Sequence, residues 1–298
     1  MRCDKCGRVA ILFQKYSGQH LCRQHFVGDL EAKAKRAIRT HRWMSPGDHI
    51  AVALSGDAAS SALVFFLKKL TAQRRDIQVS AITVDEGISG FRDPVQAQRI
   101  AKSLGANCIC GSFDKDYGIT MDAIIQQKGT ANACHNCRVL RSFLLNRIAH
   151  AHGITKLALG SSLDDGAEDI LGDVLCGAVE RMILSRHMVA GVVPAIQPFM
   201  HVPASELCIY ADVHAIEYAS HGCPHAVNSL QGDIRTMLTD YDFNHPGTKH
   251  ALVNLRENLA GISCRAAETI PVCTRCGEPA TGICRNCGML DEYIRELF

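Results

Sequence analysis

The chain has 298 residues, and its content of 47% hydrophobic and 21% charged residues is typical of a folded protein rather than a disordered one. Its formal net charge of +2 excludes nucleic-acid binding over the whole surface, so any such surface has to be local. The sequence has no secretion signal and no apolar run near the ~20 residues of a membrane span. We therefore expect a cytoplasmic protein that does not enter a membrane.

The most unusual feature of the composition is its fifteen cysteines. In a reducing compartment disulfides are disfavoured, so clustered thiols indicate metal or redox chemistry. Most of these cysteines form clusters at the two ends and in the middle of the chain. Five others lack such partners and are expected to be buried as small apolar residues, and they are Cys108, Cys110, Cys176, Cys208 and Cys264.

Residues 1–28 carry the first cluster, a Cys-x2-Cys pair followed by a Cys-x2-His pair. Each close pair fits on one turn, and four nitrogen and sulfur ligands suit tetrahedral zinc. The alternative is four unrelated buried residues. We predict an N-terminal zinc finger, with the ligands Cys3, Cys6, Cys22 and His25.

A basic run follows at residues 33–43 and ends on Trp43. It is the one local candidate for a nucleic-acid surface, although a solvated helix face is the simpler interpretation of such a run.

Residues 45–265 are predicted to form the main domain. The apolar run at 49–54 predicts a buried strand, which breaks at Ser55-Gly56 into a helix at 59–70. Strands are predicted again at 77–87, which ends in acids and glycine, at 106–113, and at the start of 156–177, where a strand, a loop and a helix follow one another. Helices alternate with these strands, and Gly105 and Gly153 close two of them. Such βαβα alternation indicates a doubly wound parallel sheet with helices on both faces. The loops at 55–60, 85–90 and 160–165 should then face one crevice at the carboxyl ends of the strands.

The C-terminal segment 269–298 contains two further Cys-x2-Cys pairs with seven residues between them, each followed by glycine. Four thiolates at this spacing indicate a second, structural zinc module resembling a zinc ribbon. Its predicted ligands are Cys273, Cys276, Cys284 and Cys287.

Seven motifs, in this order, resemble the PP-loop enzymes of tRNA 2-thiouridine synthesis. They are the Cys-x2-Cys…Cys-x2-His pairs, the strand-SGxxxS-helix, VDEGISGFR (84–92), CHNCRVLRSFLLN (134–146), LALGSSLDDGAEDIL (157–171), HGCPHAVNS (221–229) and the terminal Cys-x2-Cys-Gly pairs. The resemblance covers residues 3 to about 290. It implies an adenine nucleotide alpha hydrolase-like fold, and an enzyme that activates a uridine C2 oxygen with ATP and Mg²⁺ and replaces it with sulfur.

The resemblance also implies a 4Fe-4S cluster held by Cys134, Cys137 and Cys223. A Cys-x2-Cys pair with one distant thiolate is unusual for structural zinc, whereas soft thiolates with one open corner suit an iron–sulfur cluster. Two alternatives remain for the pair Cys134 and Cys137: zinc with His135 or His225, or a redox pair.

The nucleotide loop departs from the family pattern Ser-Gly-Gly-x-Asp-Ser. Ser55, Gly56 and Ser60 remain, but the second glycine is Asp57 and the family aspartate is Ala59. Asp57 adds a Cβ and a negative charge where phosphate would bind. Either Asp57 replaces the missing acid as a magnesium ligand, or adenylation is lost.

The second nucleotide loop, at 160–166, keeps Gly160, Asp164 and Asp165 but lacks the family's His, Asn and Glu. The resemblance places Asp164 and Asp165 near the metal and the uridine. It places Arg141 where a basic residue helps the activated oxygen to leave.

The function predicted from these residues is tRNA 2-thiolation, with tRNA and a sulfur donor as partners, the donor being sulfide or a ubiquitin-like carrier. The family also implies a homodimer. Two alternatives stay open. One is an ATP-independent iron–sulfur protein that moves or removes sulfur on tRNA or on a small thiolated molecule. The other is a degenerate tRNA-binding subunit, for which decayed cluster cysteines would be expected.

Overall fold

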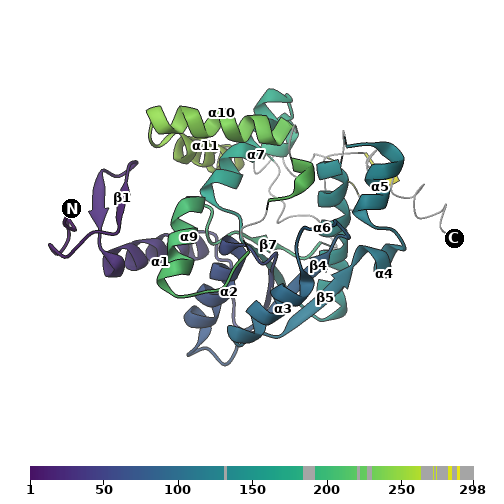
Figure 1. Ribbon diagram of the computed structural model, residues 1–298, viewed down its shortest axis with the longest axis horizontal. Coiled ribbons are helices and arrows are strands. Elements are labelled where there is room, and N and C mark those ends of the chain that lie inside the picture. Colours follow the sequence, from purple (N-terminus) through teal and green to yellow (C-terminus); the bar gives the residue numbers. More distant parts are fainter. Residues whose placement is uncertain are drawn as a thin grey trace.

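The computed structural model describes residues 1–130, 133–183, 192–219, 222–226 and 230–262, together with 271, 273, 281–283, 287 and 288. Its main body is a five-stranded sheet with helices on both faces (Figure 1). The strands are β3 (His49–Ala53), β4 (Gln78–Asp85), β5 (Cys108–Ser112), β6 (Lys156–Leu159) and β7 (Ala195–Ile196). Every neighbouring pair is parallel, in the order β5-β4-β3-β6-β7, which confirms the predicted doubly wound sheet.

Alternation along β3 divides the core into two layers. Ile50 and Val52 face one hydrophobic cluster, and Ala51 between them faces the other. The first cluster is covered by α1 (Arg23–Thr40), α2 (Ala58–Thr71), α3 (Pro94–Ser103) and α9 (Ala204–Val213). The second is covered by α4 (Phe113–Tyr117), α5 (Met121–Lys128) and α6 (Ala133–Ala151). A sheet buried on both faces explains why its strands read as continuous apolar runs.

A third layer packs on α7 (Leu163–Leu175). The helices α10 (Leu230–Asn244) and α11 (Thr248–Ile262) share a smaller hydrophobic cluster with it. The short α8 (Val179–Ile183) follows α7, and a single 3₁₀ turn, η2, spans Pro224–Ala226. No helix in the described part of the chain is both long enough and apolar enough to cross a membrane.

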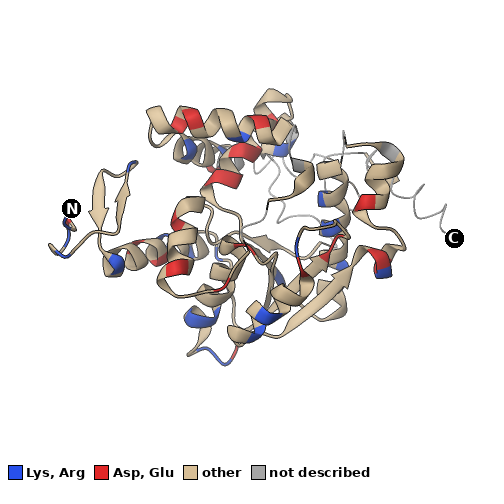
Figure 2. Cartoon of the chain, in the orientation of Figure 1, with Lys and Arg blue, Asp and Glu red and all other residues tan. Residues whose placement is uncertain are grey.

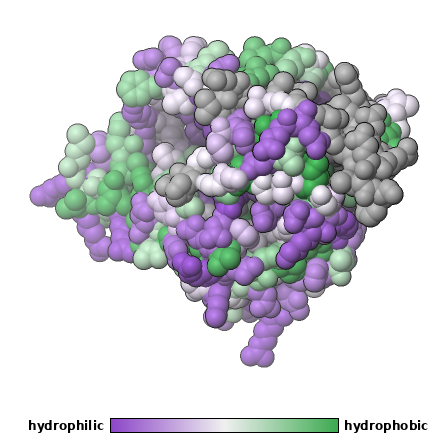
Figure 3. All heavy atoms as spheres, turned by 45° about the vertical axis from the view of Figure 1, so that its right-hand side comes forward, coloured by the Kyte–Doolittle hydropathy of each residue, from purple (hydrophilic) through white to green (hydrophobic). Residues whose placement is uncertain are grey.

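The N-terminal module is a small antiparallel hairpin, β1 (Leu12–Gln14) and β2 (Gln19–Leu21), which leads into α1. Its outer side leaves Val9, Ile11 and Phe13 exposed, and hydrophobic residues gather at this end of the surface in Figure 3. The inner side of the module is joined to the main body by Glu206, whose buried carboxylate accepts hydrogen bonds from Gln14 Nε2 at 3.1 Å and Tyr16 Oη at 2.6 Å.

Two expectations need correction or remain open. The solitary cysteines were expected in the core, but Cys110 and Cys176 are exposed, because β5 is an edge strand and Cys176 lies at the solvent-facing end of α7. Cys108 and Cys208 are only half-buried. Cys264 lies outside the described residues. Of the C-terminal ligand set, Cys273 and Cys287 are buried against the second cluster, whereas Cys276 and Cys284 lie outside the described residues, so that module remains a prediction.

Candidate functional site

The N-terminal ligand set is brought together by the hairpin and the first turn of α1. Cys22 is the N-cap residue of this helix, and His25 follows within one turn. The ligand atoms of Cys3, Cys6, Cys22 and His25 all lie within 4.8 Å of one another. Cys3 Sγ is 3.3 Å from His25 Nδ1, and Cys6 Sγ is 3.6 Å from Cys22 Sγ. Three thiols and one imidazole around a common centre can hold a tetrahedral metal ion.

The main site is a cavity of about 720 Å³ at the carboxyl ends of β3, β4 and β6. The strand order reverses around β3, which is the position where open parallel sheets bind their ligands. As expected, all three loops contribute to its wall, through Ser55, Ile88 and Gly160 among others.

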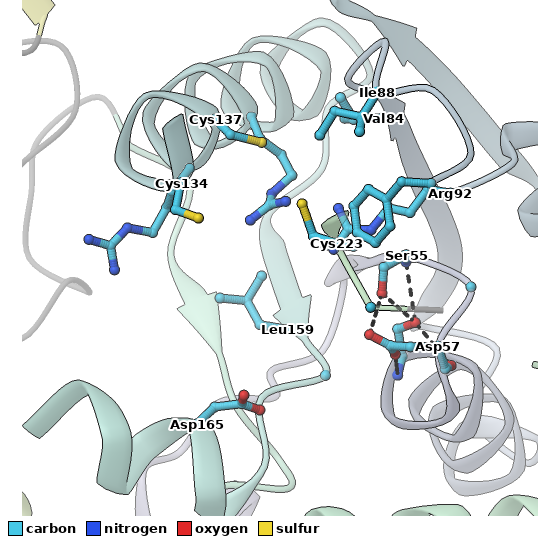
Figure 4. Close-up of a pocket in the computed structure, with 18 of the residues that line it drawn as sticks. Ser55, Asp57, Val84, Ile88, Arg92, Cys134, Cys137, Leu159, Asp165 and Cys223 are labelled. Carbon is cyan, nitrogen blue, oxygen red and sulfur yellow. Dashed lines mark hydrogen bonds between the residues drawn. The ribbon is translucent and has the colours of Figure 1, made fainter. Parts of the chain in front are cut away.

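Three thiols lie on one side of this cavity. Cys134 and Cys137 lie in the first turns of α6, and Cys223 lies just before η2, at the end of a long connection from α9. Their sulfur atoms point toward a shared space in Figure 4. Among the described residues, only the N-terminal set has three or more ligand atoms within 4.8 Å of one another, so these three thiols are spread more widely than ligands of a single ion. Soft thiolates brought together from two distant segments are ligands that suit an iron–sulfur cluster.

Burial raises the pKa of Cys137 to about 11, although the nearby Arg141 guanidinium acts in the opposite direction. Burial also raises the pKa of Cys134, and the neighbouring Cys223 thiolate adds to this effect. Both thiols are therefore protonated at neutral pH in the absence of metal, and metal binding has to release their protons.

Arg141 lies one helical turn after Cys137 on α6 and lines the same cavity. Burial alone would lower its pKa, but the interactions with Cys137 and with the Glu86 carboxylate raise it, so Arg141 stays charged. Its Nη1 donates to Glu86 Oε1 at 3.0 Å. Sequence reasoning missed Glu86, although the acidic end of the predicted strand at 77–87 was a visible signal.

In the altered nucleotide loop, the carboxylate of Asp57 accepts hydrogen bonds from other residues of the same loop. Asp57 is the N-cap residue of α2, and its Oδ1 accepts from the Ser60 amide at 2.7 Å. Its Oδ2 accepts from Ser55 Oγ at 2.7 Å (Figure 4). Gly56 has φ +85°, the left-handed conformation that this turn needs. The carboxylate therefore uses donors at the helix N-terminus that suit a bound phosphate.

The loop after β6 lies directly against the start of α2. A Cβ at Gly160 would lie 2.7 Å from the Ser60 amide nitrogen, so only glycine fits there. Asp165 forms a capping box with Ser162, whose amide and hydroxyl both donate to its Oδ2, at 2.9 and 2.7 Å. The Asp165 side chain is exposed and lines the cavity, and partial loss of water around its carboxyl raises its pKa.

Asp164 points to a different environment. Its Oδ1 accepts from Lys249 Nζ and its Oδ2 from the Ala204 amide, both at 2.6 Å. Asp164 is not among the residues that line the cavity. It joins α7 to α9 and α11, and its predicted place near the metal stays a prediction.

The basic run at 33–43, on α1 and just after it, is paired within the protein at some of its residues, while Arg36, Arg39 and Arg42 are exposed. Lys33 contacts Asp29 at 2.7 Å and Glu206 at 3.7 Å, Lys35 pairs with Glu31, and Trp43 is buried. Acidic and basic residues both surround this helix in Figure 2, which favours the solvated-face interpretation over a continuous nucleic-acid surface.

Comparison with known proteins agrees with this geometry. Residues 2–27 match the N-terminal LIM domain of the 2-thiouridine synthetase TtuA, and residues 29–238 match the PP-loop domain. The tRNA 2-thiolation protein NcsA of Haloferax volcanii is 31% identical, over 98% of this chain and 98% of that protein. The chain belongs to the PP-loop family of tRNA 2-thiolation proteins.

Other members of this family are similarly distant in sequence. A probable sulfurtransferase of Methanocaldococcus jannaschii is 28% identical, over 96% of this chain and 86% of that protein. The solved U34-tRNA thiolase NcsA of Methanococcus maripaludis, described with its 4Fe-4S cluster, superposes with a TM-score of 0.82 and 27% identity. That match covers 96% of this chain and 95% of the other. The predicted family and fold are thereby confirmed.

Proposed function

We propose that this PP-loop protein is a tRNA sulfurtransferase that replaces the C2 oxygen of a uridine with sulfur. The observation that carries the proposal is the convergence of Cys134, Cys137 and Cys223 on the cavity beside the PP-loop. The solved thiolase of Methanococcus maripaludis is described with a 4Fe-4S cluster, and the three thiols here line one cavity. Such a cluster, when bound by three thiolates, supplies an open iron site for sulfide.

The chain's own residues have complementary roles in this reaction. Arg141 remains charged and stabilises the negative charge that develops on the oxygen as it leaves the uridine. Asp165, with its raised pKa and its access to the cavity, can take or give a proton beside the uridine. Ser55, Gly56 and Ser60 form the loop that would face the phosphates of ATP, with Asp57 or Asp165 near Mg²⁺.

The remaining partners follow from the same proposal. The N-terminal set would hold one zinc ion and the C-terminal cysteines a second, ordering the two ends of the chain for tRNA binding. We further propose that sulfide or a ubiquitin-like carrier supplies the sulfur, that the protein is a homodimer, and that it acts in the cytoplasm.

A second candidate is favoured by the loop. Because Asp57 already bonds the α2 N-terminus, the protein could handle thiolated tRNA or a small thiolated molecule through its cluster without ATP. Product analysis distinguishes the two functions, since thiolation requires nucleotide and creates thiouridine, whereas sulfur removal consumes it.

The test is anaerobic reconstitution followed by incubation with tRNA, sulfide, Mg²⁺ and ATP. We expect 2-thiouridine by mass spectrometry and tRNA-dependent release of AMP. Cys223→Ser should abolish cluster binding and activity, whereas Cys176→Ser, at an exposed thiol outside the cavity, should change neither. Protein that binds zinc but no iron after reconstitution would refute the proposal.

A further inference from the structure

Two guanidinium groups donate hydrogen bonds to one buried carboxylate oxygen, that of Glu86, behind the cavity wall. Glu86 Oε1 accepts from Arg92 Nη1 at 2.5 Å and from Arg141 Nη1 at 3.0 Å. The Glu86 side chain is 1% exposed, whereas those of Arg92 and Arg141 are 24% and 30% exposed. A carboxylate this buried is retained only when it is paired, and here it has two cationic partners.

The backbone around Glu86 is held firmly. The Glu86 carbonyl accepts from the Met121 amide at 2.9 Å, which ties the end of β4 to the start of α5. The next residue, Gly87, has φ +66°, and a Cβ there would lie 2.6 Å from Thr120 Cβ. The backbone of Glu86 is therefore fixed in place, so that its carboxylate can orient Arg92 and Arg141.

Arg92 reaches Glu86 from a strained conformation. Its φ of +38° lies in the left-handed region, which is strained for a residue with a Cβ. Its guanidinium also lies over the Phe91 ring, 4.9 Å from the centroid. Strain of this kind persists only where the surrounding contacts hold it, and it often marks a functional site.

The two arginines line the cavity, but Glu86 does not. Each guanidinium donates one of its five N–H groups to Glu86, so other donors remain to face the cavity. Two positive charges against one carboxylate leave a net positive charge beside Cys137, whose thiol interacts with all three groups. Figure 4 shows Arg92 on the same side of the cavity as Cys223.

We propose that Glu86 is a positioning residue that holds Arg92 and Arg141 as a paired cationic surface for the anionic group formed or released at the reaction centre. This inference rests on the proposed sulfurtransferase function, and it gives Arg92 a place in the site beside Arg141. Glu86 acts only through the two guanidinium groups, because it has no access to the cavity of its own.

The experiment compares Glu86→Gln, Glu86→Asp, Arg141→Gln and the double variant Glu86→Gln/Arg141→Gln. Glu217→Gln is the control, since Glu217 is an exposed glutamate whose arginine partner, Arg99, is 3.9 Å away. We expect Glu86→Gln to lower kcat on the order of 100-fold by misplacing the arginines, with the KM for tRNA changed by less than about threefold. The combined loss in the double variant should be smaller than the product of the two single losses, because both changes remove the Glu86–Arg141 interaction and only the hold on Arg92 is lost in addition.

The midpoint potential of the reconstituted cluster is the second measurement, and it does not depend on turnover. Loss of the Glu86 charge favours the more negative, reduced state, so the potential should rise in Glu86→Gln. It should stay near the wild-type value in Glu86→Asp, which keeps the charge but shortens the side chain, while kcat still falls.

The results separate the two proposals. Wild-type kcat in Glu86→Gln, or additive losses in the double variant, would overturn the positioning role while leaving thiolation intact. If the wild type produces no thiouridine, the proposed function fails, and the potentials then decide alone: a rise confined to Glu86→Gln supports the role of Glu86, and an unchanged potential overturns it.

Discussion

The Asp57 carboxylate accepts the Ser60 amide proton at 2.7 Å and thereby caps α2 from within the nucleotide loop. A phosphate bound at this position would need the same amide, and at about 4 Å it would be repelled by about 4 kcal/mol at an effective dielectric of 20. This hydrogen bond indicates that Asp57 competes with phosphate for the Ser60 amide, rather than serving as a magnesium ligand.

We therefore expect Asp57→Gly to strengthen binding of Mg-ATP by about tenfold or more, measured by calorimetry. The cost to folding should be only a few tenths of a kcal/mol, since glycine is itself an acceptable N-cap. Asp76→Asn, at an exposed aspartate paired with Arg74, serves as the charge control. Weaker ATP binding in Asp57→Gly would instead assign the carboxylate to magnesium.

Gly160 is predicted to tolerate no side chain. Because a Cβ there would lie 2.7 Å from the Ser60 amide nitrogen, Gly160→Ala must push the two nucleotide loops apart. We expect a loss of about 1–3 kcal/mol in unfolding free energy by urea denaturation. Gly28→Ala is the matched control, because it lies in α1 with no atom within 4 Å of the added Cβ, and a small gain in stability is expected there.

Metal removal should loosen the N-terminal module first. Chelation removes the metal ion itself. The substitution His25→Ala removes one of its ligands, the imidazole whose Nδ1 lies 3.3 Å from Cys3 Sγ and 3.5 Å from Cys22 Sγ. The hairpin is too small to fold on its own apolar surface, so amide hydrogen exchange should rise over residues 1–22. His20→Ala, in the same hairpin but outside the ligand set, should keep the metal and the protection. Unchanged exchange after metal loss would contradict a structural metal.

Glu206 accepts hydrogen bonds from Gln14 and Tyr16 of the N-terminal module, and it should make the stability of this contact with the main body depend on pH. Burial raises its pKa above the ordinary value of 4.5, although Lys33 and the hydrogen bonds from Tyr16 and Gln14 oppose this. As pH rises, Glu206 therefore loses its proton at a lower pH in the unfolded chain than in the folded protein. The free energy of unfolding falls as pH rises from 4.5 through the raised pKa of the folded state. The difference in unfolding free energy between wild type and Glu206→Gln should decrease across this window, and a difference independent of pH would show that Glu206 is not perturbed.

Much of this protein was determined by local sequence. Continuous apolar runs that alternate with glycine-closed helices predicted the parallel sheet. A strand buried on both faces is apolar along its whole length, so each strand can be recognised from its own segment. The sequence spacing also sufficed to predict the N-terminal metal site, since each of its ligand pairs lies within one turn. Its ligands are Cys3, Cys6, Cys22 and His25.

Only the tertiary structure decided the rest, because it depends on segments far apart in the chain. It brought Cys223 to Cys134 and Cys137, and it hid Glu86 behind two arginines that are 49 residues apart in sequence (141 minus 92). It also separated two adjacent aspartates, turning Asp165 toward the cavity and Asp164 toward Lys249, because successive residues on a helix point in different directions. Finally, it showed that Asp57 bonds inward to its own helix, which sequence spacing cannot reveal because it depends on the side-chain rotamer.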